Sequence, residues 1–161
     1  MPKRVITGVV AVVSAVVLAL FSSGCQGPST GRGPAASPRS AVPPTAPTYR
    51  VTATVPVGKD PFGVAVDPGT HTVYVTNGKD NTVSVIDAST RAVTVTVAVG
   101  KRPWGVAVDP GTHTVYDTNA GDGTMSVIDA STRTVTATVP VGKDPFGVAV
   151  DPGTHTVYVT N

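Results

Sequence analysis

The residues able to do chemistry recur at a fixed spacing of 42 along this chain of 161 residues. Each repeat carries a histidine shortly after an aspartate, and these pairs are Asp67 and His71, Asp109 and His113, and Asp151 and His155. A metal ion needs several ligands within about 2 Å of one point, and acid–base catalysis needs unlike groups that converge on one atom. Copies of one unit instead distribute like residues over the molecule. The pattern therefore favours turn-capping aspartates and turn histidines, and it predicts no catalytic residue, metal site or cofactor.

The second repeat departs most from the others, at residues that could form a site. Arg102 stands where the first repeat has Asp60, and Asp117 stands where it has Val75. Asp117 interrupts an apolar strand, where an unpaired carboxylate costs several kcal/mol or takes up a proton. Two interpretations stay open: Asp117 pairs with Arg102 as part of a site, or it is drift in a copy under weak constraint.

Repeats of this spacing fill the chain from Val51 onward, at 51–92, 93–134 and, incomplete, 135–161. Residues 51–77 and 135–161 are identical. Short runs rich in valine and threonine, separated by turn residues, predict four strands in each complete unit. In the first unit these are Gly63–Asp67, Thr72–Thr76, Thr82–Asp87 and Ala92–Val99. In the turn Asp67-Pro68-Gly69, proline presets its own φ and glycine is expected to take a positive φ.

Four strands in a repeat of this length are typical of a β-propeller blade. The predicted fold is therefore all-β, with propeller blades of four antiparallel strands, two complete and one partial, in an incomplete propeller. A β-sandwich is the alternative. Val51–Val57 is expected to be a displaced outer strand, which brings the total to eleven strands.

The terminal blades of such an arrangement are predicted to lack packing and hydrogen-bonding partners. A closed propeller has about 4–8 blades, so the terminal blades should expose apolar faces and unpaired edges. We therefore expect a truncated or partial propeller gene product, or a unit that other chains complete.

A set of short motifs resembles a known family. VGKDPFGVAVD at 57–67, VYVTN at 73–77 and VSVID at 83–87 occur in this order, and they closely resemble the YVTN-family β-propeller repeat. The resemblance covers 51–161. It implies an exported or cell-surface propeller. Some relatives of that fold carry haem or hydrolyse lactones, and the repeat itself implies neither activity.

One aromatic residue per repeat stands just before or at the start of the first predicted strand. These residues are Phe62, Trp104 and Phe146. In the family that the motifs resemble, this position is close to the central opening of the propeller. The three rings could stack on a ligand there, or they could pack between blades. The candidate ligand-facing residues are therefore Phe62, Trp104, Phe146, Arg102 and Asp117.

The first 50 residues predict export and a tether. A basic start, the apolar run Val5–Phe21 and small residues before Cys25 have the order of a secretory signal peptide. The end of this segment resembles a bacterial lipoprotein signal, although Ser22 stands where that family prefers leucine. The resemblance implies a signal peptide at 1–24 and a lipid on Cys25; an ordinary signal peptide is the alternative. Residues 25–50 are rich in proline, glycine and serine, which predicts an extended linker of up to about 70 Å.

Charge argues against nucleic acid as a partner. The formal net charge is +2, but residues 51–161 hold seven basic and ten acidic residues. They therefore present no concentrated basic face of the kind that phosphate backbones require.

The function predicted from these features is a β-propeller binding or scaffold module of unknown ligand, tethered to the cell surface. The lipid on Cys25 would anchor it to the outer face of the bacterial cell membrane, and its partners would be protein or further copies at the open blade edges. The alternative is a fragment of a propeller enzyme, a haem-linked oxidoreductase or a lactonase-like hydrolase, whose active-site blades are missing. A third hypothesis gives the chain no independent role.

Overall fold

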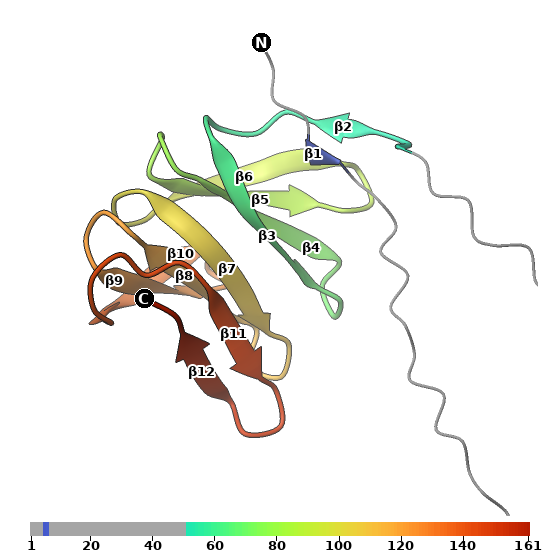
Figure 1. The fold of residues 1–161 in the computed structure, drawn as a ribbon. Coiled ribbons are helices and arrows are strands. Elements are labelled where there is room, and N and C mark those ends of the chain that lie inside the picture. Colours follow the sequence, from blue (N-terminus) through green and yellow to red (C-terminus); the bar gives the residue numbers. More distant parts are fainter. Residues whose placement is uncertain (1–4, 7–50) are drawn as a thin grey trace, which may run out of the picture. The chain divides into compact units, whose positions relative to one another are not determined.

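The structure is a computed structural model that describes residues 5–6 and 51–161, and every regular element in these ranges is a β-strand (Figure 1). Within the same ranges no helix is long and apolar enough to cross a membrane. The predicted signal peptide, apart from Val5 and Ile6, and the predicted linker with Cys25 lie outside the described residues.

Each complete repeat forms one antiparallel sheet whose four strands are paired in chain order. Blade 1 consists of β3 (Pro61–Asp67), β4 (Thr72–Asn77), β5 (Thr82–Asp87) and β6 (Ala92–Ala98). Blade 2 consists of β7 (Pro103–Asp109), β8 (Thr114–Asn119), β9 (Thr124–Asp129) and β10 (Thr134–Pro140). The third repeat contributes a half blade, β11 (Val148–Asp151) paired with β12 (Thr156–Val159). The strands predicted from the sequence of the first repeat are confirmed to within two residues at each end.

Aspartate caps hold the turns between these strands. Asp67 Oδ1 accepts the backbone N–H of Gly69 at 2.8 Å. Asp87 Oδ1 accepts the N–H groups of Ser89 at 2.8 Å and of Thr90 at 2.9 Å. The Ser89 hydroxyl and these backbone donors favour the charged form and lower the pKa of Asp87 to about 2. The predicted role of these aspartates as turn caps is confirmed.

The conformation predicted for the Asp-Pro-Gly turn was wrong in one respect. Gly69 does not adopt a positive φ; that conformation falls on the histidine two residues later, at 53° in His71 and His113 and 55° in His155. Histidine is among the side chains that enter the left-handed region more readily than most. The glycine serves a different purpose, because a Cβ at Gly69 would lie 3.2 Å from Cε1 of His113. It leaves room for a histidine ring of the next repeat.

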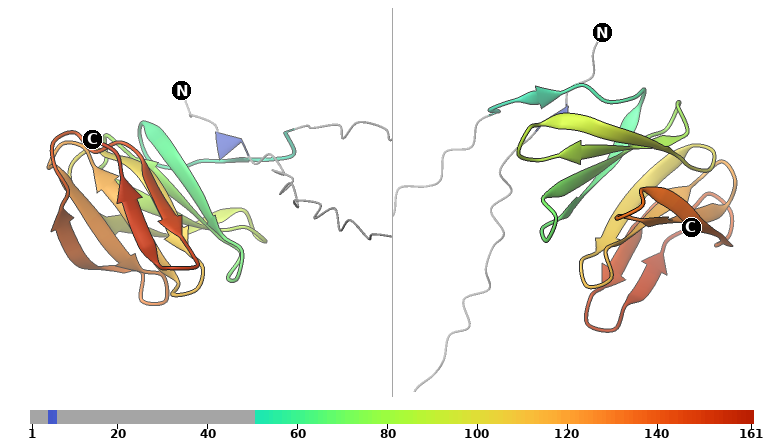
Figure 2. Two further views of the ribbon diagram at one scale, coloured as in Figure 1. Left: turned by 60° about the horizontal axis from the view of Figure 1, so that its bottom comes forward. Right: turned by 180° about the vertical axis from the view of Figure 1, so that it is seen from behind.

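The inner strands β3, β7 and β11 lie next to one another, and the sheets pack face to face behind them (Figures 1 and 2). The main core fills the space between blades 1 and 2, and its buried members are Tyr74, Val83, Val85, Val97, Val106, Val115 and Ile128. Valine and threonine suit these strands because β-branched side chains pack well on a pleated surface. The core therefore belongs to the interface between repeats rather than to either repeat alone.

The segment before blade 1 differs from its prediction. Within 51–57 only β2 (Thr54–Val55) is a strand, and it pairs with β1 (Val5–Ile6) rather than with the outer edge of a blade. Val55 is buried against Val75 and Ile86 of blade 1. This segment therefore covers part of the face of blade 1 that points away from blade 2.

Candidate functional site

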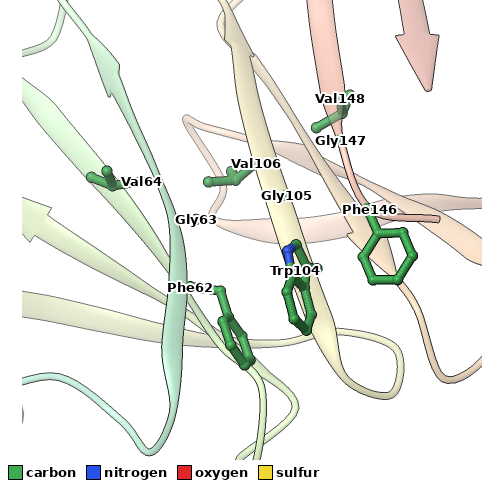
Figure 3. A pocket seen from close by; sticks show the side chains of 9 residues that line it. All are labelled: Phe62, Gly63, Val64, Trp104, Gly105, Val106, Phe146, Gly147 and Val148. Carbon is green, nitrogen blue, oxygen red and sulfur yellow. The ribbon is translucent and has the colours of Figure 1, made fainter. Parts of the chain in front are cut away.

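The three aromatic side chains form a row along one end of the inner strands (Figure 3). The pairing register shifts between Pro61 and Val64 in blade 1 and between the equivalent residues of blade 2, and such bulges re-aim side chains. The rings of Phe62 and Trp104 stack with centroids 4.0 Å apart and planes inclined by 12°. Phe146 meets Trp104 edge to face, with centroids 5.2 Å apart. The structure thus brings together the three aromatic residues that the sequence singled out.

Glycines let the neighbouring inner strands approach closely beside this row. A Cβ on Gly63 would lie 2.5 Å from the carbonyl oxygen of Trp104, and one on Gly105 would lie 2.3 Å from that of Phe146. These glycines and Gly147, together with the aromatic rings and the valines that follow, line a hollow of about 450 Å³ (Figure 3). The hollow is therefore bounded by glycine backbone, aromatic rings and valine side chains.

A second hollow of about 510 Å³ adjoins Phe62 and has a cationic rim of Lys79, Lys101 and Arg102. Lys79 is paired with Asp60 at 2.9 Å, and Lys101 lies 3.6 Å from Asp122. The guanidinium carbon of Arg102 lies 5.6 Å from the centroid of the Trp104 ring, within the range of a cation–π contact. Among residues 51–161, Arg102 forms no ion pair with a carboxylate. Its charge remains accessible beside the aromatic row.

Asp117 lies apart from both hollows. Its side chain is fully buried on the face of blade 2 that packs against blade 1, and neither carboxylate oxygen has a hydrogen-bonding partner. Burial raises the pKa of Asp117 to about 8. The pairing of Asp117 with Arg102 that the sequence allowed is not formed.

The sequence analysis did not predict a hydrogen bond between an aspartate of one repeat and a histidine of the next. Oδ2 of Asp67 hydrogen-bonds Nδ1 of His113 at 2.9 Å, and Oδ2 of Asp109 hydrogen-bonds Nδ1 of His155 at 2.7 Å. Burial raises the pKa of Asp67, but the hydrogen bonds from His113, Gly69 and Thr70 outweigh it, so that this pKa lies below its ordinary value. The constant separation of 46 residues between partners was the available signal. His113 and His155 thus each occupy a turn of their own repeat and also hydrogen-bond an aspartate of the previous repeat.

Metal binding finds no support within the described residues. No group of three or more histidine, cysteine, aspartate or glutamate side chains there could hold a metal ion. What the geometry offers instead is a stack of aromatic rings, exposed backbone and one accessible guanidinium.

Solved structures of other proteins contain a similar arrangement of strands. The structure is similar to Kuenenia stuttgartiensis hydrazine synthase, with a TM-score of 0.60 and 32% identity over 65% of this chain and 30% of that chain. It is also similar to a functionally unknown protein from Desulfotomaculum acetoxidans DSM 771, with a TM-score of 0.59 and 22% identity over 68% of this chain and 37% of that chain. The chain therefore spans about a third of the length of these proteins.

Sequence comparisons agree with the repeat architecture. A segment of 32 residues is 69% identical to PE-PGRS family protein PE_PGRS18 of Mycobacterium tuberculosis (strain ATCC 25618 / H37Rv), and it covers 20% of this chain and 7% of that protein. The family model for the YNCE-like beta-propeller matches residues 35–161. That match extends over most of the chain, so this protein belongs to the YNCE-like β-propeller family.

Proposed function

We propose that this protein is a β-propeller binding or scaffold module whose ligand-facing residues are Phe62, Trp104, Phe146 and Arg102. The observation that carries the proposal is the aromatic row beside an unpaired guanidinium, at the edge of two adjoining hollows. Aromatic faces bind flat rings through stacking, and a guanidinium without a carboxylate partner attracts an anionic group. The ligand class that fits is a flat ring with a negative group.

The fluorescence of Trp104 tests this proposal, because it is the only tryptophan in the chain. Benzoate and its neutral analogue benzamide serve as probes, with excitation near the red edge of tryptophan absorption. Benzoate should change the emission saturably, and it should bind several-fold more tightly than benzamide. Arg102→Gln should remove that preference, and Phe62→Ala should weaken both probes.

The matched control is Arg91→Gln, which removes the same charge from a turn of blade 1 outside both hollows. It should leave both affinities unchanged. If neither probe gives a saturable change, or if Phe62→Ala binds both as the unaltered chain does, the aromatic row is packing between blades and nothing more.

We further propose that the repeats are of the YVTN type and that residues 1–24 and 25–50 serve as signal peptide and linker. A lipid on Cys25 would then hold the propeller at the outer face of the bacterial cell membrane. The support is the order of charged, apolar and small residues before a lone cysteine. In a bacterial host, the protein should fractionate with membranes, and Cys25→Ala should release it. Membrane association that survives this substitution would contradict the lipid anchor.

The second candidate function is a fragment of a propeller enzyme, a haem-linked oxidoreductase or a lactonase-like hydrolase. Its support is the similarity to a solved hydrazine synthase. Absorption spectroscopy of the purified chain after incubation with haem distinguishes the two candidates. A stoichiometric Soret band would favour the oxidoreductase, and hydrolysis of a simple lactone would favour the hydrolase. If neither appears, the binding module stands.

A further inference from the structure

Blade 1 and the half blade each display one side of the interface that joins neighbouring repeats, and they lie at opposite ends of the row of sheets (Figure 2). We define the head surface as Val64, Val66 and His71 of blade 1, with the carbonyl of Phe62. We define the tail surface as Asp151, Tyr158 and Thr160 of the half blade. We propose that the tail surface of one copy of this chain binds the head surface of a second copy, by the contacts that join the repeats within the chain.

The exposure of equivalent tyrosines shows that the tail surface lacks a neighbouring blade. Tyr74 of blade 1 is 1% exposed because blade 2 covers it, whereas the equivalent Tyr158 is 59% exposed. The head surface shows the reverse trend, since Val106 of blade 2 is 9% exposed and its blade 1 equivalent Val64 is 60% exposed. Tyr74 and Val106 belong to one core cluster. Tyr158 is equivalent to Tyr74 and Val64 is equivalent to Val106, but within the chain neither has the contact that buries its equivalent.

The histidine–aspartate hydrogen bonds between repeats are likewise satisfied inside the chain and unsatisfied at its two terminal blades. Within the chain, an aspartate of each repeat holds the histidine of the next, as in Asp109 with His155. At the two ends His71 lacks an aspartate partner within residues 51–161, and Oδ2 of Asp151 accepts only the hydroxyl of Thr154. A tail surface placed on a head surface would bring Asp151 to His71. A hydrogen bond of this kind fixes the orientation of the two copies, which apolar contact alone does not.

A third contact adds a direct hydrogen bond between inner strands. The hydroxyl of Thr76 donates to the carbonyl oxygen of Trp104 at 2.9 Å, and that of Thr118 donates to Phe146 at the same distance. Thr160 stands at the equivalent position and accepts the N–H of Gly147 at 3.0 Å, as Thr118 accepts that of Gly105. Its hydroxyl proton therefore has an equivalent acceptor in the Phe62 carbonyl of a second copy.

Part of the face of blade 1 that carries the head surface is already covered by the chain itself. Val55 and Val57 already cover the part of blade 1 around Val75 and Ile86, so the open area of that face follows the inner strand β3. The half blade contains only the two inner strands, β11 and β12. The proposed contact therefore joins the inner strands of the half blade to the inner strand β3 of the second copy. Identity of 51–77 with 135–161 gives the second copy the same side chains as the internal interfaces.

Because head and tail differ, the contact is of the head-to-tail kind, which adds copies until a ring closes or a filament grows. Two blocked variants of the full chain test this directly. Tyr158→Arg blocks only the tail, and Val64→Arg blocks only the head; both side chains are exposed, so each variant should fold. Sedimentation should show each variant alone as a monomer, and an equimolar mixture as a dimer that grows no further.

Thr132→Arg is the control, since Thr132 is an exposed residue in the turn between β9 and β10 of blade 2, outside both surfaces. This variant should assemble as the unaltered chain does. Circular dichroism melts confirm that all variants are folded. Any association through residues 1–50 would enlarge both variants and their mixture alike, so the readout is the difference between them. A mixture whose mass equals the average of the separate variants would overturn the proposal, and so would an unaltered chain that stays monomeric.

Discussion

At the scale of single residues, the molecule contains two kinds of carboxylate with opposite effects on stability. Asp67 is buried but receives hydrogen bonds from a histidine and a turn, so its charge is compensated. Asp117 is equally buried and receives none. An apolar valine occupies the equivalent position in blade 1, where Val75 is buried. The absence of any partner favours drift over a functional pair for Asp117.

The pH dependence of stability should identify Asp117. Its pKa is about 8 in the folded chain, against an ordinary aspartate value of 3.8, so between these pH values the folded state binds more protons than the unfolded state. Stability should therefore fall as pH rises from about 4 to 8, by roughly 1.4 kcal/mol per pH unit from this residue. Urea unfolding at several pH values should show that Asp117→Asn removes this slope, and Asp117→Val should raise the melting temperature at pH 7.

Asp144→Asn provides the comparison, because it changes an exposed carboxylate of the same type. Its slope should equal that of the unaltered chain. An unchanged slope in Asp117→Asn would mean that the carboxylate has a partner or access to water.

Histidine variants should distinguish the stability that comes from the hydrogen bond between repeats from the stability that comes from the turn. Asparagine tolerates the positive φ of these positions, so His113→Asn removes the contact with Asp67 and keeps the turn. The loss leaves a buried carboxylate short of one donor and should cost about 1–3 kcal/mol. His71→Asn has no such contact in a single chain and should change stability by less than about 0.5 kcal/mol. Equal losses in urea unfolding of dilute protein would assign both histidines to the turn alone.

At the scale of elements, the periodicity of valine and threonine, together with the Asp-Pro-Gly turns, was enough to place the four strands of blade 1. The aspartate caps followed from local chemistry, since their partners lie two or three residues away. The contact of Asp67 with His113 did not, because it depends on how one sheet is set against the next. Gly69 was misassigned for the same reason: its lack of a side chain serves a ring from another repeat.

Close approach of the inner strands should make one glycine far more sensitive than its equivalent. A Cβ at Gly105 would lie 2.3 Å from a backbone oxygen, whereas one at Gly147 would meet only the Thr160 side chain, at 2.9 Å. Gly105→Ala should therefore cost about 1–3 kcal/mol or more, since the strands must move apart. Gly147→Ala should cost clearly less in dilute protein. Comparable losses would show that β7 and β11 are not so close.

At the scale of the whole molecule, stability is built between repeats rather than within them. Repeat architectures depend on the interface of each unit with its neighbours. The sequence predicted the blades and the exposure of their terminal faces, because identical units must present identical sides. It could not predict that 55–57 would cover part of blade 1, since the position of that segment depends on tertiary packing.

Nuclear Overhauser contacts from the Trp104 ring test the central claim, face-to-face packing of consecutive repeats, most directly. As the ring of the only tryptophan, it can be assigned without ambiguity. In dilute protein it should show contacts to the rings of both Phe62 and Phe146, which belong to the repeats on either side. If Trp104 shows contacts only within its own repeat, the blades do not pack as described here.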